Sequence, residues 1–161
     1  MVESRPALFT GGCQCGAIRY ALYGQPERVH YCHCRMCQKA SGNLFGTGAP
    51  VKLTEFAWTR GQPPAFRSST LGLRYFCPGC GTPLAFHYEG SATISPTLGS
   101  FDHPAEVPPT IEYGIEGRLP WLGAAPGMQQ VTTDTLLSPE RKAKLVSHQH
   151  PDHDTPAWPP R

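Results

Sequence analysis

Short runs in which apolar and polar residues alternate make up most of this chain, and glycines or prolines separate the runs. The first is Gly16–Gly24, GAIRYALYG, whose alternation is typical of a half-buried strand. We expect Arg28–Cys34 to be its hairpin partner. Similar runs predict strands at Leu44–Val51, Glu55–Thr59, Ala65–Ser69, Leu73–Cys77, Pro83–Glu89, Ala92–Ser95 and Ile111–Ile115. Because strand follows strand without helical periods between them, the pattern predicts a mainly β fold of antiparallel sheets.

Two segments depart from this pattern and predict short helices. Arg35–Ser41, RMCQKAS, tolerates helix and is followed by Gly42, a residue type that often ends a helix in the left-handed conformation. Leu137–His148 predicts a second helix, with Ser138 as its N-cap and Pro139 in the first position. We therefore expect one or two short helices beside the sheets.

A single domain is expected to hold most of the chain. Domains commonly contain roughly 100–150 residues, so we place one unit of this 161-residue chain over 1–146. The remaining residues, 147–161, are rich in proline and polar side chains and predict a flexible tail. Its spaced histidines, His148, His150 and His153, are expected to be solvated rather than to bind a metal ion.

The charge pattern argues against a nucleic-acid or membrane partner. Lys and Arg number 14 and Asp and Glu 12, which gives a net charge of +2, and the basic residues are scattered. So small a charge produces too weak a field to attract nucleic acid or a membrane surface. No apolar run approaches the roughly 20 residues that span a bilayer, and the first residues lack the features of a signal peptide. We expect a cytoplasmic protein.

The cysteines are the first residues whose pattern indicates a chemical role. All seven fall into three tight groups, namely Cys13 and Cys15, then Cys32, Cys34 and Cys37, then Cys77 and Cys80. Disulfides are rare in a reducing compartment, and an odd number of thiols cannot all pair. Metal ligation is therefore the better explanation. Such isolated pairs resemble zinc sites more than iron–sulfur clusters, so we expect zinc.

Four of the cysteines are expected to complete one zinc site. Cys77 and Cys80 enclose a Pro-Gly turn, CPGCG, which directs both sulfurs toward one point. A structural zinc prefers four ligands, so the pair needs another. Cys13 and Cys15 stand at positions i and i+2, which face the same side of an extended chain. Two pairs make a four-thiolate structural site.

The central triplet, Cys32, Cys34 and Cys37, then remains for a second zinc. Cys32 and Cys34 share a strand face, and Cys37 follows at the spacing of one helical turn. Three protein ligands with an open fourth position are the layout of a catalytic zinc. The alternative is a second structural site completed by His33 or by a more distant residue. His33 should face the other way, whereas His30 shares the sulfur face and is the better internal ligand.

Residues near the triplet are candidates for the walls of the open position. Gln38, Lys39 and Ser41 follow the ligands directly, although helix surface and helix capping explain Lys39 and Ser41 at least as well. Phe101 and Trp121 are aromatic residues in loops, and clefts favour aromatic walls, although a core position is the commoner place for such side chains.

Five motifs, in this order and at these separations, resemble the glutathione-dependent formaldehyde-activating enzyme family, also called the GFA or CENP-V family. They are GGCQCGAIRY, YCHCRMCQKASG, FCPGCGTPL, GSFDHP and PWL, and the resemblance runs from about Gly11 to Leu122. The resemblance implies a β-tent of antiparallel sheets with zinc staples. It also implies two zinc ions per chain, one held by the four paired cysteines and a catalytic one held by the triplet.

The activity that the resemblance implies is a carbon–sulfur lyase run in the synthetic direction. Glutathione and formaldehyde condense to S-hydroxymethylglutathione, so the expected partners are a small thiol and an aldehyde, and a homodimer is left open. Two departures concern substrate choice: Glu112 stands where family members often carry histidine, and Asp102-His103 replaces paired acids. The alternative function is a zinc-stapled β-tent that binds a partner without catalysis.

Overall fold

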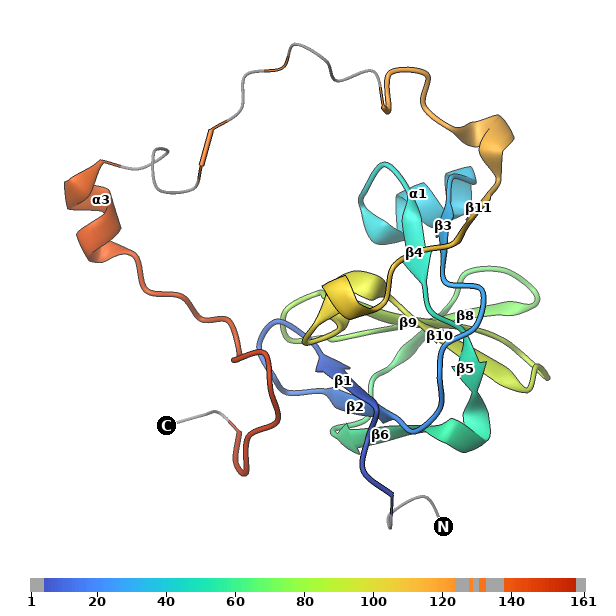
Figure 1. Ribbon diagram of the computed structural model, residues 1–161, viewed down its shortest axis with the longest axis horizontal. Coiled ribbons are helices and arrows are strands. Elements are labelled where there is room, and N and C mark those ends of the chain that lie inside the picture. Colours follow the sequence, from blue (N-terminus) through green and yellow to red (C-terminus); the bar gives the residue numbers. More distant parts are fainter. Residues whose placement is uncertain (1–4, 124–127, 129–130, 133–137, 159–161) are drawn as a thin grey trace.

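The computed structural model describes residues 5–123, 128, 131–132 and 138–158. Its strands form three sheets around a common interior (Figure 1). The first sheet has the order β1 (Phe9–Gly12), β2 (Arg19–Leu22), β6 (Phe56–Arg60). The second has the order β5 (Val51–Lys52), β10 (Thr93–Pro96), β9 (Pro83–Tyr88), β8 (Gly72–Phe76), β7 (Ala65–Arg67). The third has the order β11 (Ile111–Tyr113), β3 (His30–Cys32), β4 (Gly46–Gly48).

The predicted fold class, mainly β with antiparallel sheets and short helices, is confirmed. Every pairing between described strands is antiparallel except that of β11 with β3, which is parallel. The described helices are α1 (Arg35–Ser41) and α3 (Pro139–Lys144), with a few 3₁₀ turns elsewhere. Within these residues, neither helix has the length or the apolar run that crossing a bilayer requires.

The predicted hairpin of Gly16–Gly24 with Arg28–Cys34 is wrong. Strand β2, inside the first of these segments, pairs with β1 and β6, whereas β3, inside the second, pairs with β4 and β11. The prediction missed β1 because its sequence, FTGG, ends in two glycines and carries no clear alternation. The predicted strand Leu44–Val51 is divided between two sheets as β4 and β5. Pro50 lies at the break, where it has no backbone N–H to donate to a sheet.

The core forms around β2, all of whose residues are buried. The Tyr20 ring stacks on Phe56 with 5.6 Å between centroids and meets the edge of Phe101 at 5.7 Å. Its phenol oxygen lies 2.8 Å from Ser100 Oγ, so this buried polar group is paired. Phe101 is thus a core residue. Trp121, the other aromatic residue considered as a pocket wall, is 57% exposed.

The local signals around α1 are confirmed. Gly42 ends the helix with φ 61°, in the left-handed region where a side chain is strained, and Cys34 is the N-cap. The helix lies beside β3 and β4 (Figure 1). Its position carries Cys34 and Cys37 toward Cys32 at the end of β3, which is how one short segment brings the triplet together.

The C-terminal segment returns to the first sheet after α3, which itself lies apart from the sheets (Figure 1). His150 is buried there, and its backbone N–H donates to Gln14 O at 2.7 Å. Asp154 accepts a hydrogen bond from Arg19 Nε at 2.8 Å, and Trp158 Nε1 donates to Cys15 O at 2.5 Å. These contacts join the segment to the β1–β2 loop and to the first residue of β2. The domain boundary at 146 and the flexibility of the tail stay predictions.

Candidate metal centres

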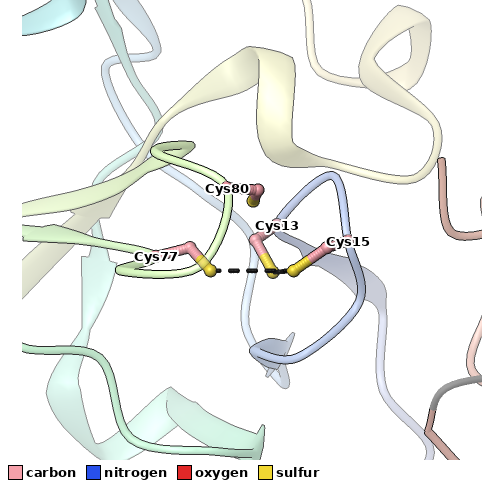
Figure 2. A group of neighbouring side chains, drawn as sticks. All are labelled: Cys13, Cys15, Cys77 and Cys80. Atoms are coloured by element: carbon pink, nitrogen blue, oxygen red, sulfur yellow. Dashed lines mark hydrogen bonds between the residues drawn. The ribbon is translucent and has the colours of Figure 1, made fainter. Parts of the chain in front are cut away.

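The first cluster joins two loops that are distant in sequence. Cys13 and Cys15 lie between β1 and β2, Cys77 and Cys80 lie between β8 and β9, and Figure 2 shows all four side chains gathered between the two loops. The Sγ atoms of Cys13 and Cys15 are 3.5 Å apart, and those of Cys15 and Cys77 are 3.8 Å apart. A tetrahedral zinc with bonds of about 2.3 Å separates its sulfurs by about 3.8 Å, so this arrangement fits zinc.

Hydrogen bonds orient these sulfurs. Ile18 N–H donates to Cys13 Sγ at 3.3 Å, and Thr82 Oγ1 lies 3.2 Å from Cys80 Sγ. Burial raises the pKa of the Cys13 thiol to about 12. Burial also opposes ionisation of Cys80, but hydrogen bonds from Thr82 and from the backbone of Cys15 outweigh it and lower its pKa to about 6. A bound divalent cation favours the ionised form of every sulfur, which suits a site that buries several thiols together.

The second cluster comes from one segment. The Sγ atoms of Cys32, Cys34 and Cys37 lie within 4.8 Å of one another. Cys34 Sγ accepts a hydrogen bond from Cys37 N–H at 3.4 Å, the geometry of an N-cap side chain. Burial raises the pKa of Cys32 to about 12. Burial also acts to raise that of Cys34, but hydrogen bonds, chiefly from the backbone of Cys37, outweigh it and lower the pKa.

Neither candidate histidine joins the triplet. Among the described residues, no imidazole nitrogen lies within 4.8 Å of all three sulfurs. His33 is 1% exposed and packs against the Phe45 ring with 5.7 Å between centroids. Its Nε2 lies 3.6 Å from Glu112 Oε1, so the predicted opposite orientation fits its surroundings. His30 contributes to the wall of the adjoining pocket, and burial lowers its pKa.

The triplet opens into a pocket of about 430 Å³. Its walls combine apolar and aromatic side chains (Met36, Pro50, Phe86, Tyr88 and Tyr113) with hydroxyl groups (Thr47, Ser68, Ser69, Thr93 and Ser95). All three triplet cysteines line the pocket, whereas none of the four clustered at the other site does. A ligand in this pocket can therefore reach the triplet sulfurs directly.

Three residues considered as walls lie elsewhere. Gln38 is buried and donates through its side-chain amide to Gly117 O at 3.1 Å. Ser41 Oγ donates to Cys37 O at 2.8 Å, which makes it a capping residue of α1. Lys39 is exposed and does not line the pocket. For these residues helix packing and capping are the correct interpretation.

One residue of the pocket that contacts the triplet was not predicted from the sequence. Arg74, on β8, lines the pocket, and its Nη2 donates to Cys37 Sγ at 3.5 Å. The contact joins residues 37 positions apart, one on α1 and the other on β8. Alternation within a strand indicates only which side Arg74 faces, so no local signal could identify this partner.

Seven thiols in these two arrangements are a donor set suited to zinc, since thiolates select soft and borderline metal ions. The four-sulfur cluster would hold one ion with no ligand position left. The triplet would hold another through three sulfurs, with its remaining position toward the pocket. Fold and clusters together define a class: a mainly β domain with two cysteine clusters that could hold metal ions.

Comparison with known proteins narrows this class to a family. The profile of the glutathione-dependent formaldehyde-activating enzyme family matches residues 8–116, more than half of the chain, and the chain belongs to that family. A Rhodobacter sphaeroides protein of known crystal structure is 16% identical and superposes with a TM-score of 0.53. The superposition covers 65% of this chain and 98% of that chain, and it supports the fold alone. The family match includes all seven cysteines.

Proposed function

We propose that this protein is a zinc-dependent carbon–sulfur lyase that joins a small thiol, glutathione or a related compound, to an aldehyde. The observation that carries the proposal is the direct opening of the Cys32, Cys34 and Cys37 sulfurs into the pocket. Membership of the formaldehyde-activating family supports the same chemistry. In the reaction the thiol sulfur bonds to the aldehyde carbon, the carbonyl π bond breaks, and the thiol proton ends on the new hydroxyl oxygen.

The two metal sites have separate roles in this proposal. Cys32, Cys34 and Cys37 would hold a zinc ion that, when bound, would lower the pKa of a thiol at its remaining position toward neutral. The pocket walls do the remaining work. Aromatic side chains such as Phe86 and Tyr113 bind the organic part of the thiol and displace water, while nearby hydroxyl groups supply donors for the alkoxide oxygen. Holding thiol and aldehyde together turns an encounter of two solutes into a reaction between neighbours.

The zinc at Cys13, Cys15, Cys77 and Cys80 is structural in this proposal, since its four ligands leave no position for substrate. A reducing compartment such as the cytoplasm would keep all seven thiols available to metal. Two zinc ions per chain are therefore expected when the protein is prepared under reducing conditions.

The test combines metal analysis with an exchange measurement. Wild-type protein should contain two zinc ions and should accelerate the formation of S-hydroxymethylglutathione, measured by exchange NMR spectroscopy with glutathione and formaldehyde. Cys34→Ser should lose one zinc ion and the acceleration. Lys39→Ala, on the exposed face of α1, is the matched control and should retain both. If wild-type protein holds two zinc ions but does not accelerate condensation of any small thiol with the aldehyde, the proposed enzymatic function is wrong. That result would favour the alternative of a binding module without catalysis.

A further inference from the structure

The pocket beside the triplet contains one arginine and no carboxylate among its described lining residues. Arg74 projects from β8 and is half-buried. Its Nη2 donates to Cys37 Sγ at 3.5 Å and its Nε donates to Ser68 Oγ at 3.1 Å. The guanidinium carbon Cζ lies over the Phe86 ring, 4.9 Å from the ring centroid. Three contacts thus hold the charged group in one orientation at the edge of the pocket.

This charge has no anionic carboxylate partner in the described part of the chain. The ion pairs found there involve other residues, such as Arg67 with Glu89 at 2.8 Å, and the hydrogen bonds of Arg74 found there use Nε and Nη2 but not Nη1. A partly buried charge is costly unless something compensates it. With a divalent cation bound, the three thiolates of the triplet would carry a net charge of −1 beside this guanidinium. Nη1 of this guanidinium remains a donor that a further anion in the pocket could use.

Distances make Arg74 and a bound thiol neighbours. A fourth sulfur at a zinc held by the triplet would lie about 3.8 Å from Cys37 Sγ, as tetrahedral geometry requires. Arg74 Nη2 lies 3.5 Å from the same atom. Both atoms lie close to Cys37 Sγ, so no more than about 7 Å would separate Nη2 from the fourth sulfur, and an acidic group joined to the thiol by a linker can span that distance. Arginine suits this role because its fixed fork of N–H groups matches a carboxylate.

We propose that Arg74 is a specificity-determining residue that selects thiols bearing a carboxylate within reach of its guanidinium. This inference rests on the proposed function and names the chemical class of its thiol. The aromatic wall formed by Phe86 holds the guanidinium in place and binds the linker of the substrate. Neutral thiols bind through the sulfur but make no ion pair with Arg74. Cationic thiols bind more weakly because Arg74 repels them.

The test compares three thiols of similar size on zinc-loaded protein by isothermal titration calorimetry: 3-mercaptopropionate, 2-mercaptoethanol and cysteamine. The variants are Arg74→Gln, which removes the charge, and Arg74→Lys, which keeps it without the fork. Arg67→Gln is the matched control, since Arg67 is exposed and does not line the pocket. Zinc content and near-UV circular dichroism check that each variant is folded. Cobalt-substituted protein reports, through its sulfur-to-metal charge-transfer band, whether the thiol is a ligand.

Wild-type protein should bind 3-mercaptopropionate most tightly and cysteamine least tightly. Arg74→Gln should lower the affinity for 3-mercaptopropionate by about 10- to 100-fold, the range expected for one hydrogen bond between charged groups. The affinity for 2-mercaptoethanol should fall by less than about 3-fold. Arg74→Lys should retain part of the preference, and Arg67→Gln all of it. Equal weakening of the charged and neutral thiols, or a preference that survives in Arg74→Gln, overturns the inference while thiol binding to the metal still supports the proposed function. Absence of any thiol ligand at the metal in wild-type protein overturns both.

Discussion

The two cysteine clusters use the same ligand chemistry but connect the chain in opposite ways. The four-sulfur cluster joins loops whose ligands, Cys15 and Cys77, lie 62 positions apart. The triplet gathers ligands from positions 32–37 of one segment. A cross-link restricts the unfolded chain more strongly when it closes a longer loop, by roughly 4 kcal/mol for one of about 60 residues in the relation used for disulfides. A metal at the first cluster therefore stabilises the fold, whereas one at the triplet contributes less.

The two clusters also differ in how far their cysteines are buried. Cys13 and Cys77 are buried and Cys15 and Cys80 are partly buried, and the C-terminal segment contacts the loop that carries Cys13 and Cys15. All three triplet cysteines are only partly buried and face a pocket. A site that is distant in sequence and enclosed suits stability, and a site that is local and open suits chemistry. The following variants are chosen to break or sharpen this contrast.

Cys77→Ser is expected to have the largest effect on stability. Loss of a ligand at the long-range cluster removes both the metal and its cross-link, so the free energy of unfolding should fall by about 4 kcal/mol or more. Urea denaturation combined with zinc analysis measures this change. If Cys77→Ser retains the wild-type unfolding midpoint, the stabilising role of the long-range cluster is wrong.

Asp102→Asn should have the next largest effect on stability. Asp102 accepts hydrogen bonds from Thr10 on β1 and Arg19 on β2, the strands that flank the loop of Cys13 and Cys15. Arg19 and Asp102 form a two-fold hydrogen-bonded ion pair, with side chains 3% and 4% exposed. Removing the carboxylate leaves Arg19 buried with only Asp154, whose side chain is 52% exposed. The expected loss is about 3–5 kcal/mol at pH 7.

The same pair predicts a pH dependence. Burial acts to raise the pKa of Asp102, but hydrogen bonds from Arg19 and Thr10 outweigh it and hold the pKa below its ordinary value. The stabilisation is therefore complete above the unfolded pKa of about 3.9 and is lost as pH falls through the lower folded value. Urea denaturation should show wild-type protein and Asp102→Asn converging below about pH 4. A constant difference across this range would contradict the assignment.

Cys34→Ser should separate activity from stability. The variant should lose the thiol–aldehyde activity, yet its free energy of unfolding should fall by only about 1–2 kcal/mol, since its metal closes no long loop. Denaturation beside Cys77→Ser provides the direct comparison. Equal losses in the two variants would show that the triplet is a second structural site.

Trp158→Phe should produce the smallest effect. It removes the hydrogen bond from the indole N–H to Cys15 O while keeping an aromatic ring, and the indole is 48% exposed. A net loss of about 0.5–1.5 kcal/mol is expected, with faster release of one zinc ion to a chelator. Trp121→Phe, at an exposed tryptophan, is the matched control. Identical release rates in both variants would show that the C-terminal segment does not protect the cluster.

Sequence reasoning succeeded where a signal is local. Strand β9 (Pro83–Tyr88) lies within the predicted Pro83–Glu89, and α1 ends before Gly42 as its left-handed cap requires. The N-cap role of Ser138 is also confirmed, because its side chain accepts a hydrogen bond from Arg141 N–H. The grouping of cysteines into four and three could be obtained by counting ligands, since a four-coordinate metal limits the combinations.

Contacts between distant segments escaped such reasoning. The parallel pairing of β11 with β3 joins positions about 80 residues apart, and nothing in three-residue strands specifies a partner. The interaction of Arg74 with Cys37 is equally remote from local pattern. His150 was expected in solvent, yet it is 4% exposed, and Arg60 Nη1 lies 3.3 Å from its Nε2. All three features depend on how the sheets and the C-terminal segment pack against one another. The periodicity of apolar residues within one strand does not predict such packing.

The indole of Trp158 gives this protein a built-in optical reporter. Tryptophan emission responds to nearby charge and hydrogen bonding, and this indole donates to the backbone carbonyl of Cys15, a residue of the four-sulfur cluster. Loss of metal from that cluster should therefore change the fluorescence of the C-terminal segment. Subtraction of the spectrum of Trp158→Phe isolates the signal, so occupancy of the enclosed site can be followed without a label while the open site is titrated separately.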